Sequence, residues 1–303
     1  MVVTGASSGL GRATAFELAN RGATVILAAR RKAALLEVAQ RCGPRAFVVE
    51  TDVTNEDDVQ LLARTALDEY GRIDVWINNA GVTYYAALED GPMEPHRRVI
   101  EANLFGAMHG ARAAVPIFRR QRHGVLINVG SVLSEVGQAF VPSYAISKFG
   151  VRGLSEALRV ELADERDIHV CTVLPYAIDT PHFQVAANRI GKRPRALPPM
   201  QSPEKVARAI AALVERPRRM LHVPRSITLG LVFHALFPRT AERLLLDALR
   251  RWHMSKDAET IGTGNLFTPG GDAKVHGDRG PMIGTMKFLG WCAQRLVRNA
   301  VSR

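Results

Sequence analysis

The chain begins Met1-Val2-Val3-Thr4-Gly5-Ala6-Ser7-Ser8-Gly9-Leu10-Gly11, and this stretch decides the fold. A short apolar strand leads into a turn with three spaced glycines, and a helical pattern follows at once. Gly5 permits a tight turn, Gly9 lets the backbone approach a ligand, and Gly11 lets the helix pack against the sheet. Free N–H groups at a helix start attract phosphate, and two serine hydroxyls lie beside them. The turn therefore predicts a dinucleotide phosphate site formed by Gly5, Ser7, Ser8, Gly9 and Leu10; a purely structural turn is the alternative.

Short apolar strands alternate with amphipathic helices over the first 174 residues. Strands are expected at 2–3, 23–28, 46–49, 75–78, 125–129 and 168–174, and helices at 12–20, 32–41, 56–70, 97–118 and 147–164. Strands that are apolar on both faces and separated by helices indicate a parallel sheet covered on both sides. Right-handed crossovers then give an α/β fold with a doubly wound, Rossmann-like sheet.

The pattern becomes less regular beyond Pro175. Helices are expected at 202–215, 240–252 and 285–300, and the Gly-, Pro- and Asp-rich segment 262–281 is expected to be an irregular arm or linker. The apolar run 227–237 predicts a buried helix, with a membrane contact as the alternative. The last helix mixes apolar with basic residues, so it can lie on an anionic membrane surface, pack on the body or join a dimer.

The composition is that of a globular protein. Of 303 residues, 47% are apolar and 23% charged, which excludes disorder and low-complexity fibres. No apolar run approaches the ~20 residues of a membrane span. Three distant cysteines form no paired motif, and the first residues do not resemble a signal peptide, so we expect a reduced, cytoplasmic protein. The first strand is shorter than the usual ~5–6 residues, which leaves open whether the chain begins upstream.

Positive charge is concentrated in the last third of the chain. Residues 1–200 carry 23 Lys and Arg against 21 Asp and Glu, whereas residues 201–303 carry 17 against 8. A basic tail on a near-neutral body indicates an anionic partner or a solvated basic face. Aromatic residues are few and no recognition module is present, so we expect no nucleic-acid partner.

The end of the second strand predicts which nicotinamide cofactor binds. An NAD site usually places Asp or Glu there to hold the ribose 2′-hydroxyl. This chain has Arg30 and Arg31, with no acidic residue before Glu37. A guanidinium group suits a 2′-phosphate, and Arg12 begins the helix nearby. We therefore expect NADP(H) rather than NAD(H), with Arg30 as its ligand unless that side chain is merely solvated.

A catalytic group is suggested by Tyr144, Lys148 and Ser131. Tyr144 and Lys148 are four residues apart at the start of a helical stretch and share one face. An ammonium group near a phenol lowers the phenol pKa from about 10, which makes Tyr144 a usable acid or base. Ser131 follows strand 125–129 at the carboxyl edge of the sheet, where its hydroxyl can bind a substrate carbonyl oxygen. A helix-surface Tyr–Lys pair is the alternative.

These residues together resemble those of the short-chain dehydrogenase/reductase family, in its compact single-domain branch. The motifs occur in family order over about residues 1–215: Thr4-Gly5-x-x-x-Gly9-x-Gly11, Asp52-Val53, Asn78-Asn79-Ala80-Gly81, Asn103, Ser131, and Tyr144 with Lys148. The resemblance implies a Rossmann-type catalytic domain over 1–215, with a substrate lid at 180–200. A basic helical C-terminal extension then occupies 216–303.

The resemblance also implies roles for individual residues. Tyr144 would donate or accept the proton, Ser131 would polarise the carbonyl, Asn103 would hold a water, and Lys148 would also bind the nicotinamide ribose. Contacts with the cofactor are implied for Arg30, Asp52, Val53, Asn79, Ala80, Gly81, Tyr144, Lys148, Pro175, Ile178 and Thr180. Tyr176 stands where the family commonly has glycine, so it either reshapes the substrate side or points away.

The sequence thus predicts an NADP(H)-dependent oxidoreductase that transfers hydride between nicotinamide and a carbonyl or secondary alcohol, without a metal. The partly apolar lid and the apolar run 227–233 favour a lipophilic substrate. A non-catalytic NADP(H)-binding scaffold or regulator is one alternative, and a sugar epimerase or dehydratase is another. The complete Asn-Ser-Tyr-Lys set disfavours the first, and the glycine spacing disfavours the second. The resemblance implies a homo-oligomer, and peripheral membrane contact through the last helix stays open.

Overall fold

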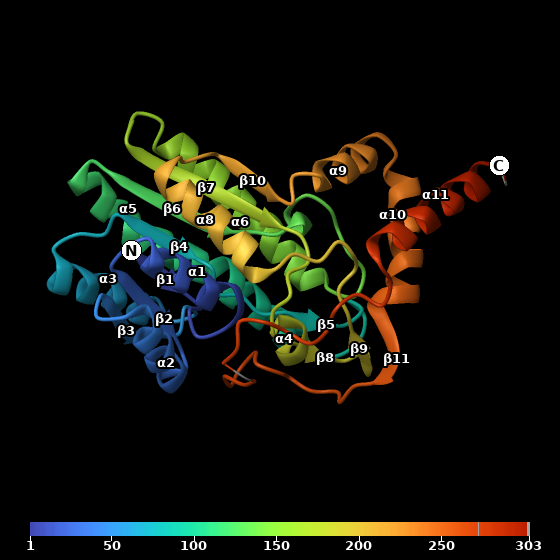
Figure 1. Cartoon of the computed structure of the whole chain (residues 1–303), viewed down its shortest axis with the longest axis horizontal. Coiled ribbons are helices and arrows are strands. Elements are labelled where there is room, and N and C mark those ends of the chain that lie inside the picture. The colour runs from blue at the N-terminus through green and yellow to red at the C-terminus, as the bar shows by residue number, and fades with distance from the viewer. Residues whose placement is uncertain (272, 302–303) are drawn as a thin grey trace.

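A seven-stranded parallel sheet forms the centre of the computed structural model, which describes residues 1–271 and 273–301 (Figure 1). The strand order is β10-β7-β6-β4-β1-β2-β3. The strands are β1 (Val2–Thr4), β2 (Val25–Ala29), β3 (Ala46–Glu50), β4 (Val75–Asn78), β6 (Gly124–Val129), β7 (Ile168–Pro175) and β10 (Met220–Val223). The order reverses between β1 and β4, so a crevice for ligands opens at the carboxyl ends of these strands. The doubly wound α/β sheet is confirmed.

Two layers of helices bury the sheet. Helices α1 (Gly9–Asn20), α2 (Lys32–Cys42) and α8 (Pro203–Glu215) cover one face, and α3 (Glu56–Tyr70), α5 (Gly106–Gln121) and α6 (Pro142–Glu161) cover the other. Neighbouring strand residues point to opposite layers, as Trp76 and Ile77 do. This double burial explains why the strands are apolar throughout.

The single helix expected over 97–118 is interrupted by a π-helical turn. Helix α4 (Met93–Ile100) continues through Glu101–Phe105 into α5. Such turns insert an extra residue into a helix and are frequent at functional sites. Here the turn contains Asn103, which it directs into the protein interior.

The lid region is more ordered than its prolines indicate. It contains α7 (His182–Val185), β8 (Ala187–Asn188) and β9 (Lys192–Pro194). Strand β8 pairs with β5 (Tyr84–Tyr85), and β9 pairs with β11 (Met254–Ala258). The lid is therefore held to the body on one side and to the C-terminal region on the other.

The chain beyond residue 215 contributes to the sheet before it forms a separate group of helices. Strand β10 extends the sheet beside β7, past the boundary expected at 215. Helices α9 (Ile227–Leu236), α10 (Pro238–Ala248) with its π-helical turn Leu249–His253, and α11 (Thr285–Val301) follow. We call these elements the C-terminal lobe; Figure 1 shows it beyond the carboxyl ends of the strands. Helix α9 was expected to be buried, but none of its residues is.

The irregular segment 262–281, which we call the arm, leaves β11, passes along the body and returns to α11 (Figure 1). It has no helix and no main strand in the part that the structure describes. The arm therefore depends on contacts with the body for its position. Among the described residues, no helix has the length and apolar character needed to span a bilayer.

Candidate active site

A large cavity, of about 530 Å³, lies at the carboxyl edge of the sheet. Every residue expected in the site lines this cavity except Asn103. The glycine turn and the ends of β2 and β3 form one half. Ser131, Tyr144, Lys148 and the loop after β7 form the other half. The fold thus brings together residues from six separate strand ends.

The glycine turn is shaped by main-chain requirements. Gly9 has φ +55°, a left-handed conformation that favours glycine. A Cβ added at Gly11 would overlap the carbonyl oxygen of Gly5, so the helix can approach the turn only without a side chain there. The Asn79 side-chain amide donates to the Thr4 carbonyl oxygen at 2.9 Å. This bond ties the end of β4 to the turn.

Asn103 supports the site without lining the cavity. Its amide nitrogen donates to the Val82 carbonyl oxygen and to Ser147 Oγ, each at 3.0 Å, and its Oδ1 accepts from the Val82 N–H at 2.8 Å. A Cβ at Gly81 would lie 3.3 Å from Asn103 Oδ1 and 3.7 Å from Lys148 Nζ. The absence of a side chain at Gly81 therefore leaves space beside both of these side chains. The water expected at Asn103 stays a prediction.

Tyr144, which is half-buried, and Lys148, which is buried, lie side by side on the first turns of α6. Lys148 Nζ donates to the Val129 carbonyl oxygen at 2.8 Å and lies 5.5 Å from the centre of the Tyr144 ring. Burial lowers the pKa of Lys148 to about 8. Burial also raises the pKa of Tyr144 to about 12, against the effect of its hydrogen bond with Ser131. The expected lowering of the Tyr144 pKa is therefore absent here, because desolvation outweighs the hydrogen bond with Ser131.

Ser131 is held in place by a capping interaction. Its Oγ accepts from the Leu133 N–H at 3.1 Å, and its own N–H donates to Ser134 Oγ at 3.2 Å. These bonds cap the short 3₁₀ turn Val132–Ser134 that follows β6. The hydroxyl is also hydrogen-bonded to Tyr144, and a substrate oxygen would replace Tyr144 as its partner.

Three histidines that line the cavity were not predicted from the sequence: His182, His234 and His253. His182 Nε2 lies 2.6 Å from Thr83 Oγ1, and its ring centre lies 5.9 Å from that of Tyr144. Burial, assisted by the charge of Lys148, lowers the pKa of His182 to about 4. Burial likewise lowers the pKa of His253 to about 4. The position of His182, two residues after Thr180 of the nicotinamide loop, is the signal that would have found it.

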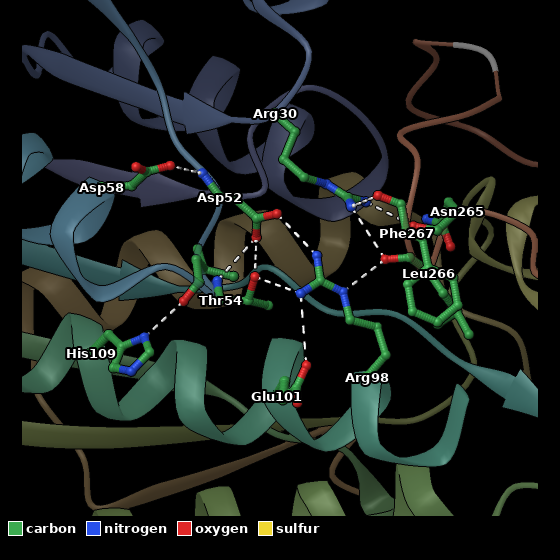
Figure 2. Close-up of polar contacts among 11 residues, drawn as sticks. Arg30, Asp52, Thr54, Asp58, Arg98, Glu101, His109, Asn265, Leu266 and Phe267 are labelled. Atoms are coloured by element: carbon green, nitrogen blue, oxygen red, sulfur yellow. Dashed lines mark hydrogen bonds and ion pairs between the residues drawn. The ribbon is translucent and has the colours of Figure 1, made fainter. Parts of the chain in front are cut away.

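The end of the cavity near β2 holds a pair of guanidinium groups (Figure 2). Arg98, which was not expected in the site, donates to Asp52 Oδ2 at 3.0 Å and to Thr54 Oγ1 at 2.6 Å. Although burial acts to raise it, the bonds from Thr54 and the charges of Arg98 and Arg30 hold the pKa of Asp52 below its ordinary value. Asp52 is therefore a fixed, ionised wall of the cavity.

The arm occupies the hydrogen-bond donors of this end of the cavity. Arg30 donates to the carbonyl oxygens of Asn265 at 2.7 Å, Leu266 at 3.2 Å and Phe267 at 3.1 Å (Figure 2). The Gly9 N–H donates to the Lys274 carbonyl oxygen at 2.8 Å. Arg31 and Arg12 donate to further arm carbonyls. The segment expected to be an arm or linker thus covers the groups expected to bind phosphate.

The groups present fit a nicotinamide dinucleotide. The turn offers N–H donors, the arginines offer positive charge, and the Tyr144 side offers an acid–base group beside an apolar wall. The fold and this cavity together define a dinucleotide-binding oxidoreductase.

Comparisons with known proteins agree. Residues 1–190 match the short chain dehydrogenase family. The uncharacterized oxidoreductase YxnA of Bacillus subtilis (strain 168) is 38% identical over the whole of this chain and 86% of its own length. The cis-4-hydroxycyclohexanecarboxylate dehydrogenase of Sinomonas cyclohexanicum is 38% identical over 70% of this chain and 87% of its own length.

Solved structures give the same result. A short-chain dehydrogenase from Streptomyces avermitilis aligns with a TM-score of 0.69 and 28% identity, over 82% of this chain and 97% of its own. A 3-ketoacyl-(acyl-carrier-protein) reductase from Brucella melitensis, complexed with NADH, has a TM-score of 0.66 and 28% identity over 73% of this chain and 95% of its own.

The chain belongs to the short-chain dehydrogenase/reductase family, which confirms the resemblance seen in its motifs. It is an oxidoreductase that acts on CH–OH or C=O groups with a nicotinamide cofactor.

The buried histidines predict a loss of stability in acid. The pKa of His253 is about 4 in the folded chain and 6.5 in the unfolded chain. The unfolded chain therefore binds more protons between these values, so stability is lost as the pH falls from 6.5 to 4, by about 3 kcal/mol for this residue. A His253→Asn variant, which retains a donor for the Arg195 carbonyl, should lose correspondingly less. Urea unfolding at pH 7 and pH 4.5 measures the difference.

The exposed His123 provides the control for this experiment. A His123→Asn variant should follow the parent chain at both pH values. Equal acid sensitivity of the His253→Asn variant and the parent would show that His253 is not buried in its neutral form.

Proposed function

We propose that this chain transfers hydride between NADP(H) and the carbonyl or secondary alcohol of a lipophilic small molecule. The observation that carries the proposal is the position of Ser131, Tyr144 and Lys148 on one cavity wall, where the glycine turn and the apolar lid also meet. A bound nicotinamide would supply or accept the hydride. Side chains of this protein would then donate and accept the proton.

Each catalytic side chain has a distinct part in the proposed reaction. Ser131 donates its hydroxyl proton to the substrate oxygen, which orients the carbonyl. Tyr144 gives its proton to that oxygen during reduction and takes it back during oxidation. Lys148, with a pKa of about 8, is charged at neutral pH and stabilises negative charge on the phenol oxygen. Asn103 positions this group through Ser147 and Val82.

Preference for NADP(H) is supported by the end of β2. Arg30 and Arg31 face the cavity there, and no carboxylate stands where an NAD site needs one. Among the neighbours, the Brucella melitensis reductase is complexed with NADH, and an alcohol dehydrogenase from Thermococcus sibiricus, with a TM-score of 0.62 and 26% identity over 73% of this chain and 93% of its own, is complexed with 5-hydroxy-NADP. Membership of the family therefore does not determine whether NADP(H) or NAD(H) binds, and local residues such as Arg30 do.

The remaining cofactor contacts follow from the order of residues along the cavity. We assign the adenine end to Asp52 and Val53, the middle to the turn and to Asn79-Ala80-Gly81, and the nicotinamide end to the loop after β7. That loop contributes Pro175, Ile178 and Thr180. Tyr176 packs against apolar residues of the lobe, so it forms part of the substrate wall.

A lipophilic substrate is supported by the walls beyond Tyr144. Val132, Leu133, Val141 and Phe183 line the cavity on this side, together with Tyr176. Burial of a ring or an acyl chain against such walls contributes about 25 cal/mol per Å² of apolar area. The Sinomonas cyclohexanicum relative is named for a hydroxylated cyclohexane carboxylate, which makes a cyclic alcohol a sensible first probe.

We also propose a cytoplasmic homo-oligomer with peripheral membrane contact. Phe105, Ile146 and Phe149 are exposed around the π-helical turn and on α6. Exposed apolar residues that lie near one another mark protein interfaces. Two copies meeting there would bury them close to the catalytic group, and the basic C-terminal helix would stay free to meet a lipid surface.

Replacing Tyr144 tests the proton step. A Tyr144→Phe variant should lose at least about 10²-fold in kcat with cis-4-hydroxycyclohexanecarboxylate or cyclohexanone, because it removes the hydroxyl that gives and takes the proton. Its Kd for NADPH, measured by nicotinamide fluorescence, should stay within about twofold of the parent. Retained turnover would refute the role of Tyr144. NADPH binding without turnover of any alcohol or ketone by the parent would favour a scaffold.

Replacing Arg30 tests the cofactor. An Arg30→Asp variant should lose about tenfold or more in affinity for NADPH and gain affinity for NADH, because a carboxylate repels the 2′-phosphate and accepts from a free 2′-hydroxyl. Titration of both cofactors measures the ratio, and an Arg64→Asp variant on α3 is the matched control. An unchanged ratio would show that Arg30 does not meet the 2′-phosphate.

The contacts of the arm with Arg30 predict that the observed rate of NADPH binding reaches a limit. The 2′-phosphate has to compete with three arm carbonyls for Arg30, so the observed binding rate should level off at high NADPH. Leu266→Ala removes the buried anchor of the arm and should raise that plateau several-fold. Stopped-flow fluorescence measures both, with Leu61→Ala as an exposed control. A linear, identical dependence in all three proteins would contradict displacement of the arm.

A further inference from the structure

The cavity continues past the catalytic group into the C-terminal lobe. Its walls there come from all three lobe helices: Ile227, Leu231 and Phe233 of α9, Leu244 and Leu245 of α10, and Phe288 of α11. Ile227 and Leu231 pack in the same apolar cluster as Tyr144 and Tyr176. One apolar wall therefore runs from the catalytic phenol to the lobe.

Helix α9 is apolar on both of its faces. The residues opposite the cavity are exposed: Leu229 by 77%, Val232 by 51% and Leu236 by 67%, followed by Phe237 at 55%. The helix contains no charged residue and buries none of its side chains fully. A helix that is hydrophobic all round belongs in an apolar surrounding, and a contiguous exposed apolar patch marks an interaction surface. We call Leu229, Val232, Leu236 and Phe237 the lobe face.

Two arginines border the lobe face. Residues 220–241, which include β10 and α9, contain no Asp or Glu; the next acidic residue is Glu242. Arg225 and Arg239, at the two ends of α9, are both exposed. An apolar face bordered by arginines matches a bilayer surface with anionic headgroups. Two copies of this face would bring like charges together, which disfavours a dimer there.

We propose that the lobe face rests on an anionic lipid surface and that the substrate reaches Tyr144 from that surface, between the lobe helices. The proposal rests on the oxidoreductase function proposed above. It names the substrate class further: a carbonyl or alcohol compound that partitions into a bilayer. The inner face of α9 guides the compound along the cavity, and the outer face anchors the protein.

Vesicle binding tests the lipid contact directly. The full chain should sediment with phosphatidylcholine vesicles that contain phosphatidylglycerol, less with phosphatidylcholine alone, and less again at high salt. A Leu229→Glu/Val232→Glu variant should bind at least about tenfold more weakly, because it places two carboxylates on the lobe face. Leu61→Glu, an exposed position on α3, is the matched control. Absence of vesicle binding by the parent, or equal binding by both variants, would overturn the proposal.

Measurements of turnover distinguish the route through the lobe from the oxidoreductase function proposed above. With 2-hexadecanone in the same vesicles, the lobe variant should show a KM raised at least about fivefold, while its kcat/KM with water-soluble cyclohexanone stays that of the parent. Equal effects on both ketones would overturn the route through the lobe. Vesicle binding without turnover of either ketone by the parent would refute the catalytic function and leave the lipid contact standing. If light scattering showed a dimer for the parent and a monomer for the lobe variant, the lobe face would be the contact with a second copy instead.

Discussion

The structure depends on one constraint of a parallel sheet: strands end and the following helices begin at the same edge. That edge collects free N–H groups at the start of α1 and the side chains that follow each strand. Such donors cannot be left buried without partners. In this chain the carbonyl oxygens of the arm accept from them, at Gly9 and at Arg30. The arm therefore provides acceptors that a cofactor phosphate would otherwise provide.

The same burial acts in opposite directions on the two central catalytic groups. It raises the pKa of Tyr144 to about 12 and lowers that of Lys148 to about 8. Both shifts favour neutral groups, since desolvation disfavours any charge. The resting cavity thus keeps the phenol protonated, as reduction of a ketone requires. Oxidation of an alcohol requires the phenolate, so in that direction it is the charge of Lys148 that has to offset the desolvation.

The sheet and the catalytic group could be predicted because local signals specify them. The glycine turn, the apolar strands and the Tyr144–Lys148 spacing each require particular residue types at fixed positions. The contacts of Arg98, His182 and the arm could not be predicted in this way. They join segments far apart in sequence, such as Arg30 with Asn265, and the arm presents main-chain carbonyls, which every residue carries. Strand β10, which follows α8 and completes the sheet, was not predicted because it has only four residues.

One segment of chain borders both ends of the cavity. The arm covers Arg30 at the cofactor end, and farther along Arg279 donates to the Phe183 carbonyl oxygen of the lid at 2.8 Å and to Glu259 at 2.9 Å. The chain then enters α11, whose Phe288 lines the lobe end. A cofactor that displaces the arm from Arg30 therefore acts on the segment that also holds the lid.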